Sequence, residues 1–133
     1  MDFEELKEFR KDKKKLVKKY RSIPDDIETV KQVLEVLPDE RPPFSYRINN
    51  LGIETCIIKV KKIACKALKG KGVNSGLRLV YAHYKIQSVE TENTDEENTE
   101  EEIIDKEKIV FIELYHKSDK ENEDRDRILK YFK

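Results

Sequence analysis

The chain is 133 residues long, which allows one domain, and its core must be modest because 37% of the residues are hydrophobic and 42% are charged. The net charge is zero, yet residues 1–87 carry 20 basic and 12 acidic side chains (+8), whereas residues 88–133 carry 8 and 16 (−8). No stretch resembles a secretion signal or approaches the roughly 20 apolar residues of a membrane-spanning helix, so we expect a cytoplasmic protein without membrane contact.

Two antiparallel helices are predicted at the start of the chain. Residues 3–20 place apolar side chains at helical spacing. A second helix begins at Ser22, a typical capping residue, has Pro24 in its first turn and ends at Pro38. The first helix also carries the basic run 10–19, for which a solvated face is the simpler interpretation and contact with phosphate groups is the alternative.

Four strands and a last helix follow. The strands are predicted at residues 44–48, 55–63, 77–86 and 109–115, and the helix runs from a cap at Ser118 or Asp119 to Lys133. We therefore predict an α+β fold, in which two antiparallel N-terminal helices pack on a four-stranded antiparallel sheet, with a C-terminal helix in addition and all helices on one face.

An acidic insert interrupts this single domain at about residues 88–108, where ten acids and two lysines stand among Asn and Thr. The simplest interpretation is a solvated loop between two strands. The alternative is an acidic mimic of nucleic acid that folds over a basic surface.

Basic residues dominate the segment before this insert. The segment from Lys59 to Arg78, with both end residues counted, contains seven Lys or Arg residues, and no acid occurs between Glu54 and Glu90. A glycine-rich turn at residues 70–76 lets the backbone approach an anion closely. The segment is therefore either a phosphodiester-binding surface or a solvated basic hairpin.

Strand alternation bears on how these charges are arranged. It places Lys59 and Lys61 on the face of Ile57, and Arg78 on the face of Val80. Alternation within each strand leaves open whether the two faces are the same.

Several pieces occur in a familiar order: a basic first helix at residues 9–16, Lys59-Val-Lys61, the glycine turn, Ser75-Gly-Leu-Arg78, and an apolar strand ending in Tyr115-His-Lys117. This order resembles the RelE/ParE toxin superfamily, and in particular its HigB-like and orphan RelE-like branches in type II toxin–antitoxin systems. The resemblance covers nearly the whole chain apart from the insert. It implies a RelE-like fold and a toxin that cuts mRNA, in many members on the ribosome, or one that binds DNA gyrase. The implied partners are an antitoxin, where one is encoded, together with mRNA and the ribosome, and the free protein is expected to be a monomer or weak dimer.

Metal-independent RNA cleavage needs a base for the ribose 2′-OH, a stabiliser of charge on phosphorus and an acid for the leaving 5′ oxygen. The resemblance implies that Lys59 and Lys61 face the substrate as base or electrostatic stabilisers, that Arg78 holds the phosphate, and that Lys117 adds a basic group. His116 is a further candidate acid or base. The candidate RNA-binding residues are Lys62, Lys69, Lys71, Tyr81 and Tyr115.

No cofactor is expected, because Cys56 and Cys65 lack the further Cys and His residues of a zinc site.

Other functions stay open. Ribosome-dependent members of the family often have a C-terminal tyrosine that stacks on a base, and here Tyr131 lies well inside the last helix. The alternative is a non-catalytic relative that binds gyrase, a protein partner or RNA, and a plain nucleic-acid-binding module is a third hypothesis. Tyrosines on strands, such as Tyr81, and lone histidines, such as His83, are more often structural than functional.

Overall fold

The computed structural model describes the backbone of residues 1–93 and 99–133 and the side chains of residues 1–87 and 105–133. Within these ranges the elements are β1 (Asp2–Glu5), α1 (Lys7–Val17), α2 (Ile23–Val36), β2 (Ser45–Arg47), β3 (Cys56–Val60), β4 (Leu77–Asn93), β5 (Thr99–His116) and α3 (Arg125–Phe132). The predicted α+β class is confirmed.

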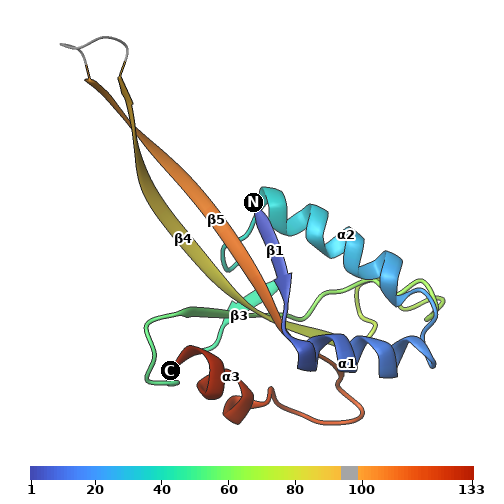
Figure 1. Cartoon of the computed structure of the whole chain (residues 1–133). Coiled ribbons are helices and arrows are strands. Elements are labelled where there is room, and N and C mark those ends of the chain that lie inside the picture. Colours follow the sequence, from blue (N-terminus) through green and yellow to red (C-terminus); the bar gives the residue numbers. More distant parts are fainter. Residues whose placement is uncertain (94–98) are drawn as a thin grey trace.

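The strands form one mixed sheet in the order β1-β5-β4-β3-β2 (Figure 1). All neighbours are antiparallel except β1, which runs parallel to β5 from Asp2↔Lys108 to Glu5↔Phe111. The prediction of four antiparallel strands is therefore wrong at the β1 edge of the sheet. The sequence pattern predicts that a helix begins in this segment, but the segment forms a fifth, parallel strand. Phe3 stacks on Phe111, with ring centroids 5.8 Å apart, and this long-range contact leaves no trace in local periodicity.

Strands β4 and β5 extend beyond the other strands as a two-stranded arm that projects from the body of the protein (Figure 1). Beyond Tyr81↔Phe111, their residues pair without a shift of register to Asn93↔Thr99. The prediction of a loop at residues 88–108 is thus wrong for residues 88–93 and 99–108, and residues 94–98 lie outside the described part. The segment includes Val, Thr and Ile residues, which favour strands, and pairing satisfies backbone groups that a loop would leave to water.

Helices cover both faces of the sheet. Ile58, Leu79 and Phe111 belong to the apolar cluster that includes residues of α1 and α2, whereas Ile57 and Val80 pack with Ile128 of α3. The prediction that all helices share one face is wrong for α3. The central strands carry apolar side chains on both faces, and both faces therefore need cover.

The C-terminal helix begins later than predicted. Its cap is Asp124, whose carboxylate accepts a hydrogen bond from the Arg127 N–H (3.1 Å), rather than Ser118 or Asp119. The Arg127 guanidinium fixes the helix by donating to Asp12 of α1 (2.7 Å) and to the Ile112 carbonyl (2.9 Å). None of the helices in the described ranges is both long enough and apolar enough to cross a membrane.

Candidate functional site

Basic side chains from three separate segments of the chain surround one open cleft of about 300 Å3. Its cations are Lys61, Lys62, Arg78 and Lys117. The remaining lining residues are Pro43, Tyr46, Asn74 and Gly76, so no acid is among the described residues that line it. We call this the cationic cleft. It lies at the end of the sheet opposite the arm, where β4 begins and β5 ends.

Strand register explains why these residues meet. β3 and β4 pair continuously from Cys56↔His83 to Val60↔Leu79, which sets Lys59 opposite Val80. Directly opposed residues share a face of an antiparallel pair, so the face of Lys59 and Lys61 is also the face of Val80 and Arg78. This register shows that the lysines and Arg78 lie on the same face of the sheet, which alternation within each strand left open.

The Arg78 guanidinium is held in place by the backbone. Its Nη1 donates to the carbonyl oxygens of Lys61 (3.1 Å) and Leu77 (3.2 Å). Its Nε and Nη2 donate to no other described residue, and they form the edge that can make two parallel hydrogen bonds to a phosphate. Since the side chain is already ordered, binding a phosphate would cost it little further conformational entropy.

Two lysines of the cleft have polar or aromatic neighbours rather than acids. The Lys62 ammonium donates to the Asn74 side-chain oxygen (2.7 Å), and the Lys61 ammonium lies 5.0 Å from the centre of the Tyr46 ring. Neither contact neutralises the positive charge, so the cleft as a whole remains attractive to an anion.

The loop between β3 and β4 is anchored at two places. In its middle, the Ser22 hydroxyl accepts from the Ala67 N–H (2.8 Å) and donates to Asp26 (2.7 Å), so Ser22 sits at the predicted cap position but binds this loop instead. Near its two ends, the buried Ser75 hydroxyl donates to the Ile63 carbonyl (2.5 Å). These contacts fix the segment that leads from Lys62 to Arg78.

Lys59 does not belong to the cleft. Its ammonium donates to Glu123 at 2.9 Å, and both side chains are largely buried, with 13% and 7% of their surface exposed. A buried ammonium bound to a carboxylate is not open to solvent and does not face a substrate. The prediction that Lys59 acts with Lys61 at the site is therefore wrong, and its partner lies 64 residues away in the sequence.

The ion pair of Lys59 and Glu123 makes the stability of the fold depend on pH. Burial would raise the pKa of Glu123, but the hydrogen bond and charge of Lys59 outweigh burial and hold the pKa below its ordinary value of 4.5. A carboxyl with a lowered folded pKa stabilises the fold above the unfolded value and loses that contribution as the pH falls through the folded value. We expect the free energy of unfolding to drop below pH 4.5, and to drop less steeply in Glu123→Gln, as measured by urea unfolding across pH; equal slopes would contradict this assignment.

His116 is tied into the structure through both ring nitrogens. Nε2 lies 2.9 Å from the Ser75 carbonyl, which can only accept, so Nε2 carries the proton. Nδ1 accepts from the Ser118 N–H (3.1 Å) and lies 2.7 Å from the Ser118 hydroxyl. The ring also stacks on Tyr20 at 5.6 Å, on the face opposite Arg78. The prediction of His116 as acid or base is not supported by this geometry, and its observed contacts fix the turn before Arg78.

Gly76 is the position at which this turn depends most on glycine. Its φ of +90° disfavours other residues, and an added Cβ would lie 2.7 Å from His116 Nε2. We expect Gly76→Ala to lower the free energy of unfolding by more than the about 1 kcal/mol typical of a positive φ alone. Gly72→Ala is the matched control, because Gly72 also has a positive φ (+54°) but open space around its Cβ position. Equal losses in urea unfolding would show that the His116 contact is unimportant.

The predicted tyrosines are core residues. Tyr81 is fully buried and donates to the Pro38 carbonyl at 2.6 Å. Tyr115 is 5% exposed, and burial, with the nearby charges of Glu123 and Glu113, raises its pKa to about 12. The prediction that Tyr81 and Tyr115 bind RNA is wrong, because apolar strand positions in the centre of a sheet are used for packing.

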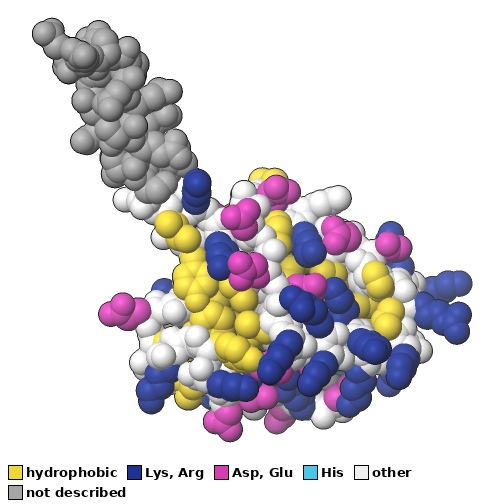
Figure 2. Space-filling model, viewed as in Figure 1, with side chains coloured by type: hydrophobic (Ala, Val, Ile, Leu, Met, Phe, Trp, Pro, Cys, Tyr) yellow, Lys and Arg dark blue, Asp and Glu magenta, His cyan; other side chains and the backbone are white. Residues whose placement is uncertain are grey.

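Other predicted positions lie outside the cleft. Lys69 and Lys71 are exposed on the β3–β4 loop but are not among the cleft residues. The basic side chains of α1 are gathered on the surface, as Figure 2 shows, and Phe9 and Leu16 form its buried side, in agreement with a solvated helix face. His83 is buried between Glu107 (3.1 Å) and Asp39 (3.6 Å), so its ring is held by contacts within the fold.

Among the cleft residues that sequence reasoning missed, Tyr46 and Asn74 carry polar side chains. Tyr46 lies two residues after the start of a predicted strand, as a core tyrosine also could. It differs from the buried tyrosines because its strand is at the edge of the sheet, which the sequence does not reveal. Asn74 lies inside the glycine-rich turn and offers no charge or periodicity as a signal.

No protein family, curated protein or solved structure matches this chain. The RelE/ParE resemblance consequently rests on the order of the residues quoted above.

Proposed function

We propose that this protein binds RNA in the cationic cleft and cuts it as a metal-independent endoribonuclease, as the toxin component of a type II toxin–antitoxin system. The observation that supports this most is the meeting of Lys61, Lys62, Arg78 and Lys117, from distant parts of the chain, around one cleft whose described lining residues include no acid. A phosphodiester is the anion that best fits several cationic donors in an open groove.

The reaction is an attack of the ribose 2′ oxygen on the adjacent phosphorus, with the bond from phosphorus to the 5′ oxygen breaking. The products are a 2′,3′-cyclic phosphate and a 5′-hydroxyl, and the proton lost from the 2′-OH is balanced by the one delivered to the leaving oxygen. Negative charge builds up on the phosphate oxygens in the transition state, and fixed cationic donors stabilise it there.

Arg78 is the central residue in this proposal, because its guanidinium is fixed and its second edge faces no described partner. Lys61 and Lys117 add positive charge on either side, and a lysine ammonium can deliver a proton to the leaving oxygen. Lys62, held by Asn74, is assigned to binding of a neighbouring phosphate.

A second candidate is a non-catalytic relative that binds RNA, or a target such as gyrase, through the same cleft. It is favoured by one observation: Lys59 and His116, two of the expected proton-transfer groups, are both engaged in structural contacts. The remaining cleft groups provide charge stabilisation more readily than base catalysis.

The test is incubation of the purified protein with a labelled single-stranded RNA in EDTA and, in a separate arm, with translating ribosomes in a magnesium-containing buffer. We expect cleavage products that end in a 2′,3′-cyclic phosphate. An RNA with 2′-deoxyribose at the cut position should bind and resist cleavage. Binding without cleavage in both settings, or inhibition of gyrase supercoiling, would favour the second candidate, and absence of RNA binding would overturn the proposal.

A further inference from the structure

Tyr46 is an exposed aromatic residue within a cleft that otherwise presents cations. It lies on β2, the edge strand of the sheet, and 37% of its surface is exposed. On the central strands of the sheet, Tyr81 and Tyr115 are buried in the core, and Tyr84 is half-buried. A single exposed aromatic ring is common on protein surfaces, so its neighbours decide whether it takes part in binding.

Register places the Tyr46 ring beside the phosphate-binding groups. Tyr46 pairs directly with Lys59 and so shares the face of Lys61 and Arg78. Lys61 lies over the ring at 5.0 Å, and Tyr46 lines the same cleft as Arg78 and Lys117. An aromatic ring next to a row of cations is the arrangement by which proteins hold single-stranded nucleic acid, with bases on the ring and phosphates on the cations.

We propose that Tyr46 stacks on the nucleobase next to the phosphate that Arg78 holds, and that it makes the cleft selective for unpaired RNA. This inference rests on the proposed function, since it assumes that the cleft binds RNA. A base inside a duplex is already stacked on its neighbours and cannot lie on the ring, so duplex RNA gains only the phosphate contacts. Tyr46 is then a binding residue for the base, while Arg78 and the lysines act on the phosphate.

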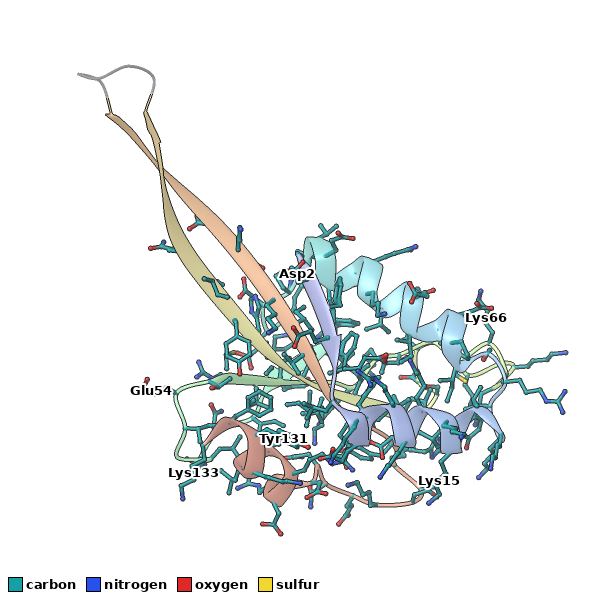
Figure 3. All side chains as sticks on the ribbon, in the orientation of Figure 1. Asp2, Lys15, Glu54, Lys66, Tyr131 and Lys133 are labelled. Carbon is teal, nitrogen blue, oxygen red and sulfur yellow. The ribbon has the colours of Figure 1, made fainter. Side chains whose placement is uncertain are left out.

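The chain contains no tryptophan, so a single Tyr46→Trp substitution introduces a unique fluorophore at the site. The probes are a 10-nucleotide single-stranded RNA, the same sequence as a duplex, and the same strand with abasic ribose at every position. We expect the single strand to quench the introduced tryptophan strongly, and the abasic strand to bind at low salt without quenching. Tyr131→Trp is the matched control, because Tyr131 on α3 (Figure 3) is similarly exposed, at 38%, but does not line the cleft, and it should show no quenching.

Affinity provides the second readout. Tyr46→Leu should weaken binding of the single-stranded RNA by about 5- to 100-fold and leave binding of the duplex unchanged, and Tyr46→Phe should retain wild-type affinity. Two results would overturn the stacking role and leave the proposed function standing. One is RNA binding that depends on Arg78 but is as tight in Tyr46→Leu as in the wild type. The other is quenching by the abasic strand that equals quenching by the intact single strand. Failure of every RNA to bind the wild type would overturn both.

Discussion

Replacing Arg78 with alanine is expected to lower the rate of RNA cleavage by about 100- to 1,000-fold, the usual effect of removing a donor that stabilises transition-state charge. The fold should persist, because the Arg78 side chain bonds to two backbone carbonyls near the surface and does not fill the core. The measurement is single-turnover cleavage with saturating enzyme, so that weaker binding does not hide the effect on chemistry.

Arg78→Lys should recover little activity. A lysine keeps the charge but cannot hold the Lys61 and Leu77 carbonyls and offer a second edge to phosphate at once. Arg47→Ala is the control for general loss of positive charge, since Arg47 is an exposed residue of β2 that does not line the cleft. If Arg47→Ala lowers cleavage as much as Arg78→Ala, nonspecific attraction is the explanation and the cleft is not the site.

Replacing Lys59 with methionine is expected to lower the free energy of unfolding by about 3–5 kcal/mol, because it removes the near cation of the buried Glu123 carboxylate and leaves it with the Arg125 guanidinium at 4.0 Å. The double variant Lys59→Met with Glu123→Leu should recover most of that loss, since an apolar pair of similar volume often replaces a buried ion pair without cost. Both are measured by urea unfolding at pH 7, with RNA cleavage assayed on the folded protein.

The exposed pair Lys108–Glu4 is the comparison for this result. Its side chains are 33% and 57% exposed, so Lys108→Met should change the free energy of unfolding by less than about 1 kcal/mol. Cleavage by the folded double variant at Lys59 and Glu123 should match the wild type. If the double variant is stable but inactive, Lys59 takes part in the chemistry and its assignment here as a structural residue is wrong.

Local patterns predicted the parts of the fold that depend on neighbours in the sequence. Alternation correctly separated Ile57 from Ile58, and helical spacing identified α1 and α2 with Phe9 and Leu16 on the buried side. The N-terminal strand was not predictable in this way, because four residues next to a helix acquire their conformation only by pairing with β5. The arm was missed because its acidic composition concealed a pairing that spans the insert.

The candidate site was only partly predictable, because it too depends on contacts between residues far apart in the sequence. Arg78, Lys61, Lys62 and Lys117 were identified by charge and order, and they line one cleft. Lys59 looked equivalent to Lys61 in the sequence, and only a carboxylate 64 residues away distinguishes the two. Charge patterning reports where cations are, but burial and partners distant in the sequence decide which of them reach solvent.

The pairing of β1 with β5 has a consequence for how the chain matures during translation. β1 adjoins only β5 in the sheet, and Phe9 of α1 stacks on Phe111 of β5 at 5.2 Å. The first helices therefore emerge from the ribosome long before the strand that covers their apolar sides has been synthesised. Until β5 has cleared the exit tunnel, the nascent chain exposes these surfaces and lacks the Lys117 side of the cleft, so neither the native core nor a complete binding surface exists before β5 has emerged.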